Sequence, residues 1–271
     1  MDFLKKLQNV DRRIIYLLFV LALAIPLIRP IGIPLQISPA TRAVYNIIES
    51  LDPATDVVLL SFEYAPGSGI DIHAIPVTVV EHLMKRGLRW VGVSFSPEGP
   101  LMMNMIIDDL ESRGYKYGED FVNLGYMAGE ENAIRLFSLD TSVFTTDSRG
   151  NSVASLPIMQ GISTVKDFAF VHGFTSSDLG IAGWLRQAVD PLGIDYAVGV
   201  VTVSVPSATP YYNSGQLKGL LGGLRGAAEY ELLIETPGLG ASMMDAQSMG
   251  HLLILGFILL GNLSYLFGKK K

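Results

Sequence analysis

Hydrophobic positions divide the chain into two apolar terminal runs and a middle of alternating short segments. Residues Ile14 to Ile28 carry no charged side chain, and neither do residues Gly250 to Phe267. Between these runs, short continuous apolar segments alternate with stretches whose apolar positions recur every three or four residues. The first pattern is typical of strands buried on both faces of a sheet, and the second of amphipathic helices. The alternation therefore predicts an α/β domain between two apolar helices.

The pattern places the elements along the chain. Strands are expected at 56–62, 89–95, 121–126, 167–171 and 195–205. Helices are expected at 38–49, 76–87, 96–113, 130–137, 177–189 and 214–234. Helix-end residues support these limits, as with Ser38-Pro39 before the first helix and Gly114 after the third. We predict a three-layer, doubly wound fold with a mainly parallel sheet of about five strands. The least regular segment, 139–165, is expected to form a hairpin or a flap over one edge.

The terminal runs have the composition of membrane-spanning helices. With its flanking residues the second run covers 247–267, which is long enough to cross the hydrocarbon layer. The first run is shorter, but Arg29 can extend to the interface, and the apolar residues that follow lengthen the segment to 14–35. We therefore expect transmembrane helices at 14–35 and 247–267. A cleaved signal peptide ending at Ala22-Leu23-Ala24 is the alternative for the first run.

Basic residues lie mainly on the outer flanks of the two runs. Lys5, Lys6, Arg12 and Arg13 precede the first run, and the chain ends in the three lysines of 268–271. Because lysine and arginine are retained on the cytoplasmic side, the tails 1–13 and 268–271 are expected to be cytoplasmic. The α/β domain, 38–240, is then extracytoplasmic. The predicted location is the cell membrane.

Composition narrows the range of functions. Charged residues make up 17% of the chain against about a quarter in soluble domains, and the net charge is −6. An acidic chain without clustered basic residues is not expected to bind nucleic acid. The absence of cysteine excludes disulfides, thiolate metal ligands and thiol nucleophiles. The four histidines form no recognisable metal motif, so neither a metal nor a cofactor is expected.

Ligands of parallel α/β sheets bind at the carboxyl ends of the strands. The loops expected at that edge carry two carboxylates, an imidazole and several hydroxyls: Glu63, Glu98, His172, Ser96, Ser176 and Ser204. Glu63 and His172 are the candidate general acid and base. Glu98 and the three serines are candidate ligand-binding residues. No G-x-S-x-G motif accompanies them, so a serine hydrolase is not indicated.

Small residues recur at helical spacing in two places. In the last predicted helix of the domain they are Gly215, Gly219, Gly222 and Gly226, and near the second apolar run they are Ser242, Ala246 and Gly250. Glycine costs about 1 kcal/mol relative to alanine inside a helix, so a stripe of glycines needs a compensating contact. We expect close packing against a second subunit or a neighbouring element. The open alternatives are that the stripe faces a ligand, or that the segment is not fully helical.

Together these features favour a membrane-anchored scaffold or assembly component whose outer domain self-associates or docks a partner. The expected partners are the lipid bilayer and either a second copy of the chain or another membrane protein. Because no catalytic motif is complete, an enzyme is the less favoured class. The alternative is an extracytoplasmic hydrolase or ligand-binding domain with its site at the carboxyl ends of the strands.

Overall fold

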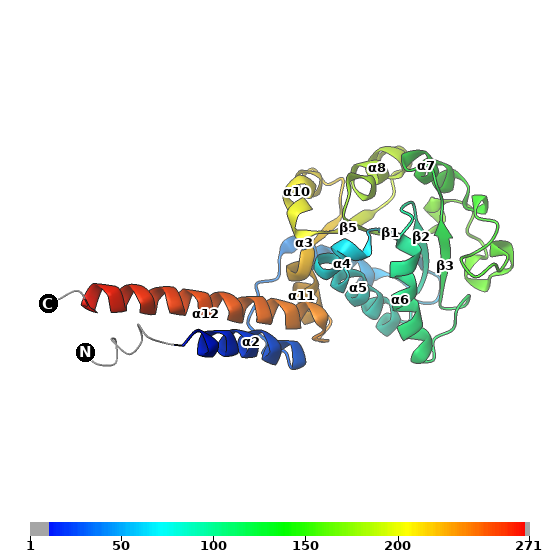
Figure 1. Cartoon of the computed structure of the whole chain (residues 1–271). Coiled ribbons are helices and arrows are strands. Elements are labelled where there is room, and N and C mark those ends of the chain that lie inside the picture. Colours follow the sequence, from blue (N-terminus) through cyan, green and yellow to red (C-terminus); the bar gives the residue numbers. More distant parts are fainter. Residues whose placement is uncertain (1–10, 269–271) are drawn as a thin grey trace. The chain divides into compact units, whose positions relative to one another are not determined.

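A computed structural model describes residues 11–268 of the 271-residue chain, and their side chains up to residue 266. The chain divides into two compact units. One comprises Gln36–Thr236, and the other combines the terminal segments Met1–Leu35 and Pro237–Lys271. The larger unit is an α/β domain built on one parallel sheet (Figure 1). The smaller unit contains two apolar helices.

The sheet of the larger unit has six strands, and every neighbouring pair is parallel. The strands are β1 (Val57–Glu63), β2 (Arg89–Ser94), β3 (Phe121–Tyr126), β4 (Phe170–Thr175), β5 (Tyr196–Val200) and β6 (Gly219–Gly222). Their order is β3-β2-β1-β4-β5-β6. This is the order of doubly wound nucleotide-binding folds, in which the chain reverses direction across the sheet between β1 and β4. Almost every strand residue is buried, which explains the continuous apolar runs in the sequence.

Helices cover both faces of the sheet. One core lies under α3 (Pro39–Ser50), α4 (Pro66–Ile72), α5 (Ala74–Arg86), α6 (Gly99–Ser112) and α11 (Gly223–Leu233). The opposite core lies under α7 (Glu131–Leu139), the continuous segment α8 (Ala182–Trp184), η6 (Leu185–Val189) and α9 (Asp190–Leu192), and α10 (Val205–Asn213). Short 3-10 turns complete the domain: η1 (Thr141–Val143), η2 (Val153–Ser155), η3 (Pro157–Met159), η4 (Val165–Asp167), η5 (Asp178–Gly180) and η7 (Thr202–Ser204).

The structure confirms the α/β class and the parallel sheet, and it corrects several elements. A sixth strand, β6, lies where a continuous helix was predicted at 214–234. The fourth strand covers Phe170–Thr175 instead of 167–171, and the helices α4 and α10 were not predicted. Segment 139–165 forms 3-10 turns with one isolated bridge, Thr146 to Ser152, instead of a regular hairpin. Its apolar side chains, including Phe144 and Ile158, belong to the core.

The predicted stripe of glycines on one helix does not exist. Gly215 lies in a turn with φ +81°, Gly219 and Gly222 begin and end β6, and Gly226 lies in α11. A Cβ atom at Gly219 would overlap Val44 of α3, and one at Gly222 would overlap Val205 of α10. At Gly226 it would lie 2.9 Å from the backbone carbonyl carbon of Leu221. These glycines therefore allow β6 to approach its neighbours within the domain, and the stripe no longer supports an interface between chains.

The smaller unit consists of α2 (Arg12–Ile28) packed along α12 (Leu239–Gly268). At Gly250 a Cβ atom would lie 3.2 Å from a methyl group of Leu23, so this small residue faces α2. Within residues 11–268, one helix is long and apolar enough to cross a membrane: it covers Leu239–Leu266, with a mean hydropathy of 1.7. Helix α2 has 17 residues, which correspond to about 25 Å.

The loop after α2 is held by a buried carboxylate of α12. Asp245 is 3% exposed, and its two oxygens accept the backbone N–H groups of Ile31, Gly32 and Ile33 at 2.6, 2.8 and 3.1 Å. Gly32 adopts φ +77°, a conformation that favours glycine and lets successive N–H groups point to one acceptor. This contact fixes the chain after α2 against the start of α12.

Candidate functional site

Glu63 lies at the end of β1 in a closed polar network. Its side chain is 2% exposed, and its carboxylate accepts the Ser61 hydroxyl and, at 3.0 Å, the backbone N–H of Phe95. The Trp184 indole N–H donates to the Ser61 hydroxyl at 3.1 Å and so extends the network into the core. Burial raises the pKa of Glu63 to about 7, although the hydrogen bonds from Ser61 and Phe95 lower it in part. The carboxyl group has no opening to a ligand.

The sequence predicts that His172 follows the fourth strand, but in the structure His172 lies inside β4. The ring is fully buried, at 4.7 Å between centroids from Phe174 and 6.0 Å from Phe170. Neither ring nitrogen has a hydrogen-bond partner among the described residues. Burial lowers the pKa of His172 to about 3, so the imidazole is neutral at ordinary pH.

The structure does not bring the candidate acid and base together. In the pairing of β1 with β4, His172 is opposite Leu60, and Glu63 is opposite Thr175. Three residues separate the two positions along the strands, which is about 10 Å. Because successive side chains alternate between faces, an odd offset also places Glu63 and His172 on opposite faces of the sheet. The two side chains therefore do not meet in one acid–base site, because the fourth strand covers Phe170–Thr175 and His172 lies inside it.

The remaining predicted ligand-binding residues are scattered. Ser96 donates to the exposed Glu98 carboxylate at 3.3 Å, before α6. Ser176 donates its backbone N–H to the Glu63 carbonyl at 3.1 Å. Ser204 precedes α10. All follow carboxyl ends of strands, as expected, but apart from the Ser96–Glu98 hydrogen bond no described contact joins them, and their role in ligand binding stays a prediction.

A groove opens instead beside the edge strand β6. It has a volume of about 600 Å³ and lies between the start of α3, helix α10 and the start of α11. Its walls are mainly apolar, with Pro39, Val205, Pro206 and Leu220 among the lining residues. Volumes of about 300–1,000 Å³ with mainly apolar walls and a few polar groups are typical of small-molecule sites.

The polar end of the groove is organised around Glu229, which is 2% exposed. One carboxylate oxygen accepts the Ser38 backbone N–H and the Thr41 hydroxyl, both at 2.9 Å. The other accepts Arg225 Nε at 2.8 Å. The carboxylate thus lies at the N-terminus of α3, where the helix dipole favours a negative charge. Arg225 is one helical turn from Glu229, and 63% of its side chain remains exposed.

The sequence reasoning missed these groove residues. The spacing of Arg225 and Glu229 is that of a helical ion pair, which is a usable signal. The sequence pattern predicts a single long helix over 214–234, however, whereas α11 starts at Gly223. The contact of Glu229 with Ser38 joins residues 191 positions apart, and no local pattern predicts it.

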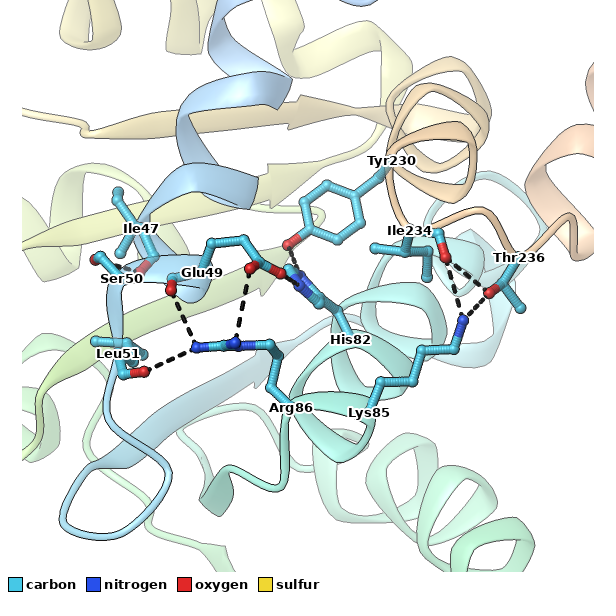
Figure 2. A network of polar contacts seen from close by, with 10 residues as sticks. All are labelled: Ile47, Glu49, Ser50, Leu51, His82, Lys85, Arg86, Tyr230, Ile234 and Thr236. Atoms are coloured by element: carbon cyan, nitrogen blue, oxygen red, sulfur yellow. Dashed lines mark hydrogen bonds and ion pairs between the residues drawn. The ribbon is translucent and has the colours of Figure 1, made fainter.

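A second polar network joins α3, α5 and α11 (Figure 2). His82 is held at both ring nitrogens, by Tyr230 at 2.8 Å and by Glu49 at 2.8 Å. Burial lowers the pKa of His82, while Glu49 opposes this shift. Arg86 donates to the carbonyls of Glu49 and Leu51 at 3.0 and 3.1 Å, and Lys85 donates to that of Ile234 at 3.1 Å.

These contacts satisfy carbonyl groups at the C-termini of α3 and α11, which have no partners within their own helices. Because both His82 nitrogens are occupied, the ring is not free to bind a ligand or transfer a proton. The network therefore stabilises the packing of the three helices. Among the described residues, no group of three or more His, Asp and Glu side chains is placed to hold a metal ion.

Comparison with known proteins adds no functional assignment. The sequence matches no family model, and no curated protein and no solved structure is significantly similar to it.

The raised pKa of Glu63 predicts a pH dependence of stability. A carboxyl whose pKa is 4.5 when unfolded and about 7 when folded contributes stability below pH 4.5 that is lost as the pH rises to about 7. The slope is up to about 1.4 kcal/mol per pH unit. Glu63→Gln, which keeps the shape but cannot ionise, is expected to lack this loss. Urea unfolding of the full chain in mild detergent, followed by tryptophan fluorescence, measures it. Parallel pH profiles of the variant and the parent chain would contradict the assignment.

The lowered pKa of His172 predicts the opposite pH dependence: the free energy of unfolding decreases as the pH falls. Its pKa is about 3 when folded and 6.5 when unfolded, so the stability present above pH 6.5 is lost as the pH falls. His172→Phe is expected to remove this acid loss. At pH 7 it should also raise the free energy of unfolding by about 1 kcal/mol, because two polar atoms without partners are removed. The same urea titration tests both effects, and a less stable variant at pH 7 would show that the ring has an unseen partner.

Proposed function

We propose that the chain is a membrane-anchored binding protein whose α/β domain holds a small, mainly apolar ligand in the groove beside β6. The observation that carries this proposal is the groove itself, with about 600 Å³ bounded by apolar walls and one polar end. Glu63 and His172 are buried and cannot contact a ligand from outside the domain, so a hydrolase based on them is not proposed.

The anchor in this proposal consists of both α2 and α12. Arg12 and Arg13 begin α2 and Arg29 follows it, so charged groups are about 25 Å apart along the helix. This is slightly less than the hydrocarbon thickness of about 30 Å, and arginine side chains can extend to the interface. Large apolar side chains are exposed on both helices, including Leu17, Val20, Leu252, Leu259 and Leu266. In lipid these side chains need no protein partner.

The polar groups between the two helices also suit a membrane interface. Asp245 would be costly in lipid without partners, but three backbone N–H groups satisfy it. The proposed topology keeps the predicted orientation. Both termini are cytoplasmic, and residues 36–236 lie outside the cytoplasm.

Self-association or partner docking is the second proposal. It is favoured by the exposed leucines of α12, which can contact a second copy of the chain as well as lipid. The predicted glycine stripe does not support this proposal, because those glycines pack against other elements of the same domain. Cross-linking in native membranes distinguishes the cases, since a chain that binds ligand as a monomer gives no cross-linked dimer.

The absence of cysteine makes the topology directly testable. Single variants Asn151→Cys and Lys270→Cys place one thiol in the domain and one in the C-terminal tail. With a membrane-impermeant maleimide on intact cells, we expect rapid labelling of the first, and labelling of the second only after permeabilisation. The reverse pattern would invert the proposed topology. Equal labelling of both in intact cells would contradict anchoring by two spans.

Ligand binding in the groove can be measured by how far it protects a cysteine that lines the groove from a thiol reagent. Thr209, on α10, lines the groove, whereas Ser112 is exposed at the end of α6. We expect N-phenyl-naphthylamine, a neutral apolar probe, to slow maleimide labelling of Thr209→Cys at least about fivefold, as for a weak but specific ligand. Labelling of the control Ser112→Cys should not change. If the probe slows neither or both equally, the groove is not a specific site.

A further inference from the structure

Arg225 is the one cation among the groove-lining residues, and only one of its nitrogens is hydrogen-bonded within the described part of the chain. Its Nε donates to Glu229, while its terminal nitrogens make no hydrogen bond within the described part of the chain. With 63% of the side chain exposed, these N–H groups are accessible from the groove mouth. A guanidinium offers donors in a planar fork that matches a carboxylate.

Glu229 does not offer a matching site for a cation. Its two oxygens already accept three hydrogen bonds, and its side chain is 3% exposed. Thr202, another lining residue, directs its hydroxyl to Asp71 at 2.7 Å. The polar end of the groove therefore presents free donors from Arg225, whereas the Glu229 carboxylate is buried and already accepts three hydrogen bonds. This asymmetry selects a ligand group that accepts hydrogen bonds and carries negative charge.

We propose that the ligand is a single-chain amphiphile with a carboxylate head, whose apolar body lies against Pro39, Val205 and Leu220 and whose head pairs with Arg225. This inference rests on the proposed binding function of the groove. A carboxylate fits better than a phosphate monoester because Glu229 already offsets the charge of Arg225, and a carboxylate adds one negative charge beside this pair whereas a phosphate monoester adds up to two. The ion pair with Glu229 holds the guanidinium at the polar end of the groove before the ligand binds.

The test uses the full chain in nanodiscs and the protection of Thr209→Cys from maleimide. Decanoate and decanol share one apolar chain and differ in the charge of the head. For each ligand the half-protecting concentration is measured in Thr209→Cys and again after adding Arg225→Gln. Taking the ratio between the two proteins cancels the different partitioning of the ligands into the bilayer. Lys218→Gln, which removes a positive charge outside the groove lining, is the matched control.

We expect Arg225→Gln to raise the half-protecting concentration of decanoate about tenfold and that of decanol less than twofold, because a partly exposed charged hydrogen bond is lost only with the acid. Lys218→Gln should change neither. Because Arg225→Gln removes the cation that pairs with Glu229, the measurement is repeated with Arg225→Gln and Glu229→Gln combined in one chain. The preference for decanoate must stay lost in this double variant.

Three failures are distinguishable. If decanol and decanoate both protect and Arg225→Gln affects them equally, the carboxylate head is wrong while the groove stands. If the double variant recovers the tenfold preference for decanoate, the effect came from repulsion by Glu229, and the assignment of Arg225 is overturned. If neither compound protects the parent chain, the proposed binding function itself fails.

Discussion

Burial of both faces of the parallel sheet is the constraint on which the rest of the domain depends. With helices on each side, water cannot satisfy the polar groups of the strands, so each needs an internal partner. Glu63 has Ser61 and the Phe95 N–H, and Asn123 donates to Asn104 at 2.8 Å. His172 in β4 and Trp90 in β2 are exceptions among the described residues, because neither ring nitrogen of His172 nor the indole nitrogen of Trp90 has a hydrogen-bond partner. The residues that look most reactive in the sequence are therefore among the least accessible.

The same constraint moves the accessible site away from the centre of the sheet. Ligands of this fold are expected where the strand order reverses, between β1 and β4. Here Glu63, Tyr64 and Thr175 are at most 2% exposed at that point. Strand β6 is short and rich in glycine, and its close approach to α3 and α10 leaves a groove between these helices and α11. Access is thus shifted to the edge of the sheet, where fewer side chains fill the space.

Two buried carboxylates tie early and late parts of the chain together, each within its own unit. Glu229 accepts the Ser38 N–H in the α/β domain, and Asp245 accepts three N–H groups of the loop after α2. A carboxylate that accepts backbone N–H groups is stabilised without a full ion pair. In the domain this arrangement leaves the terminal nitrogens of Arg225 without a hydrogen bond among the described residues, which is the basis of the proposed preference for an acidic ligand.

The sequence by itself determined the α/β class, the parallel sheet, most helix and strand positions and one helix able to cross a membrane. These features depend on local periodicity and on the length of apolar runs, which a single sequence records directly. The tertiary structure decided that 219–222 is a strand, because the glycines there allow contact with Val44 and Val205, which are distant in sequence. It also placed Glu63 and His172 on opposite faces, because a shift in the start of one strand changes which side chains share a face. The groove beside β6 arises from segments that meet only in the folded domain, so no local pattern could predict it.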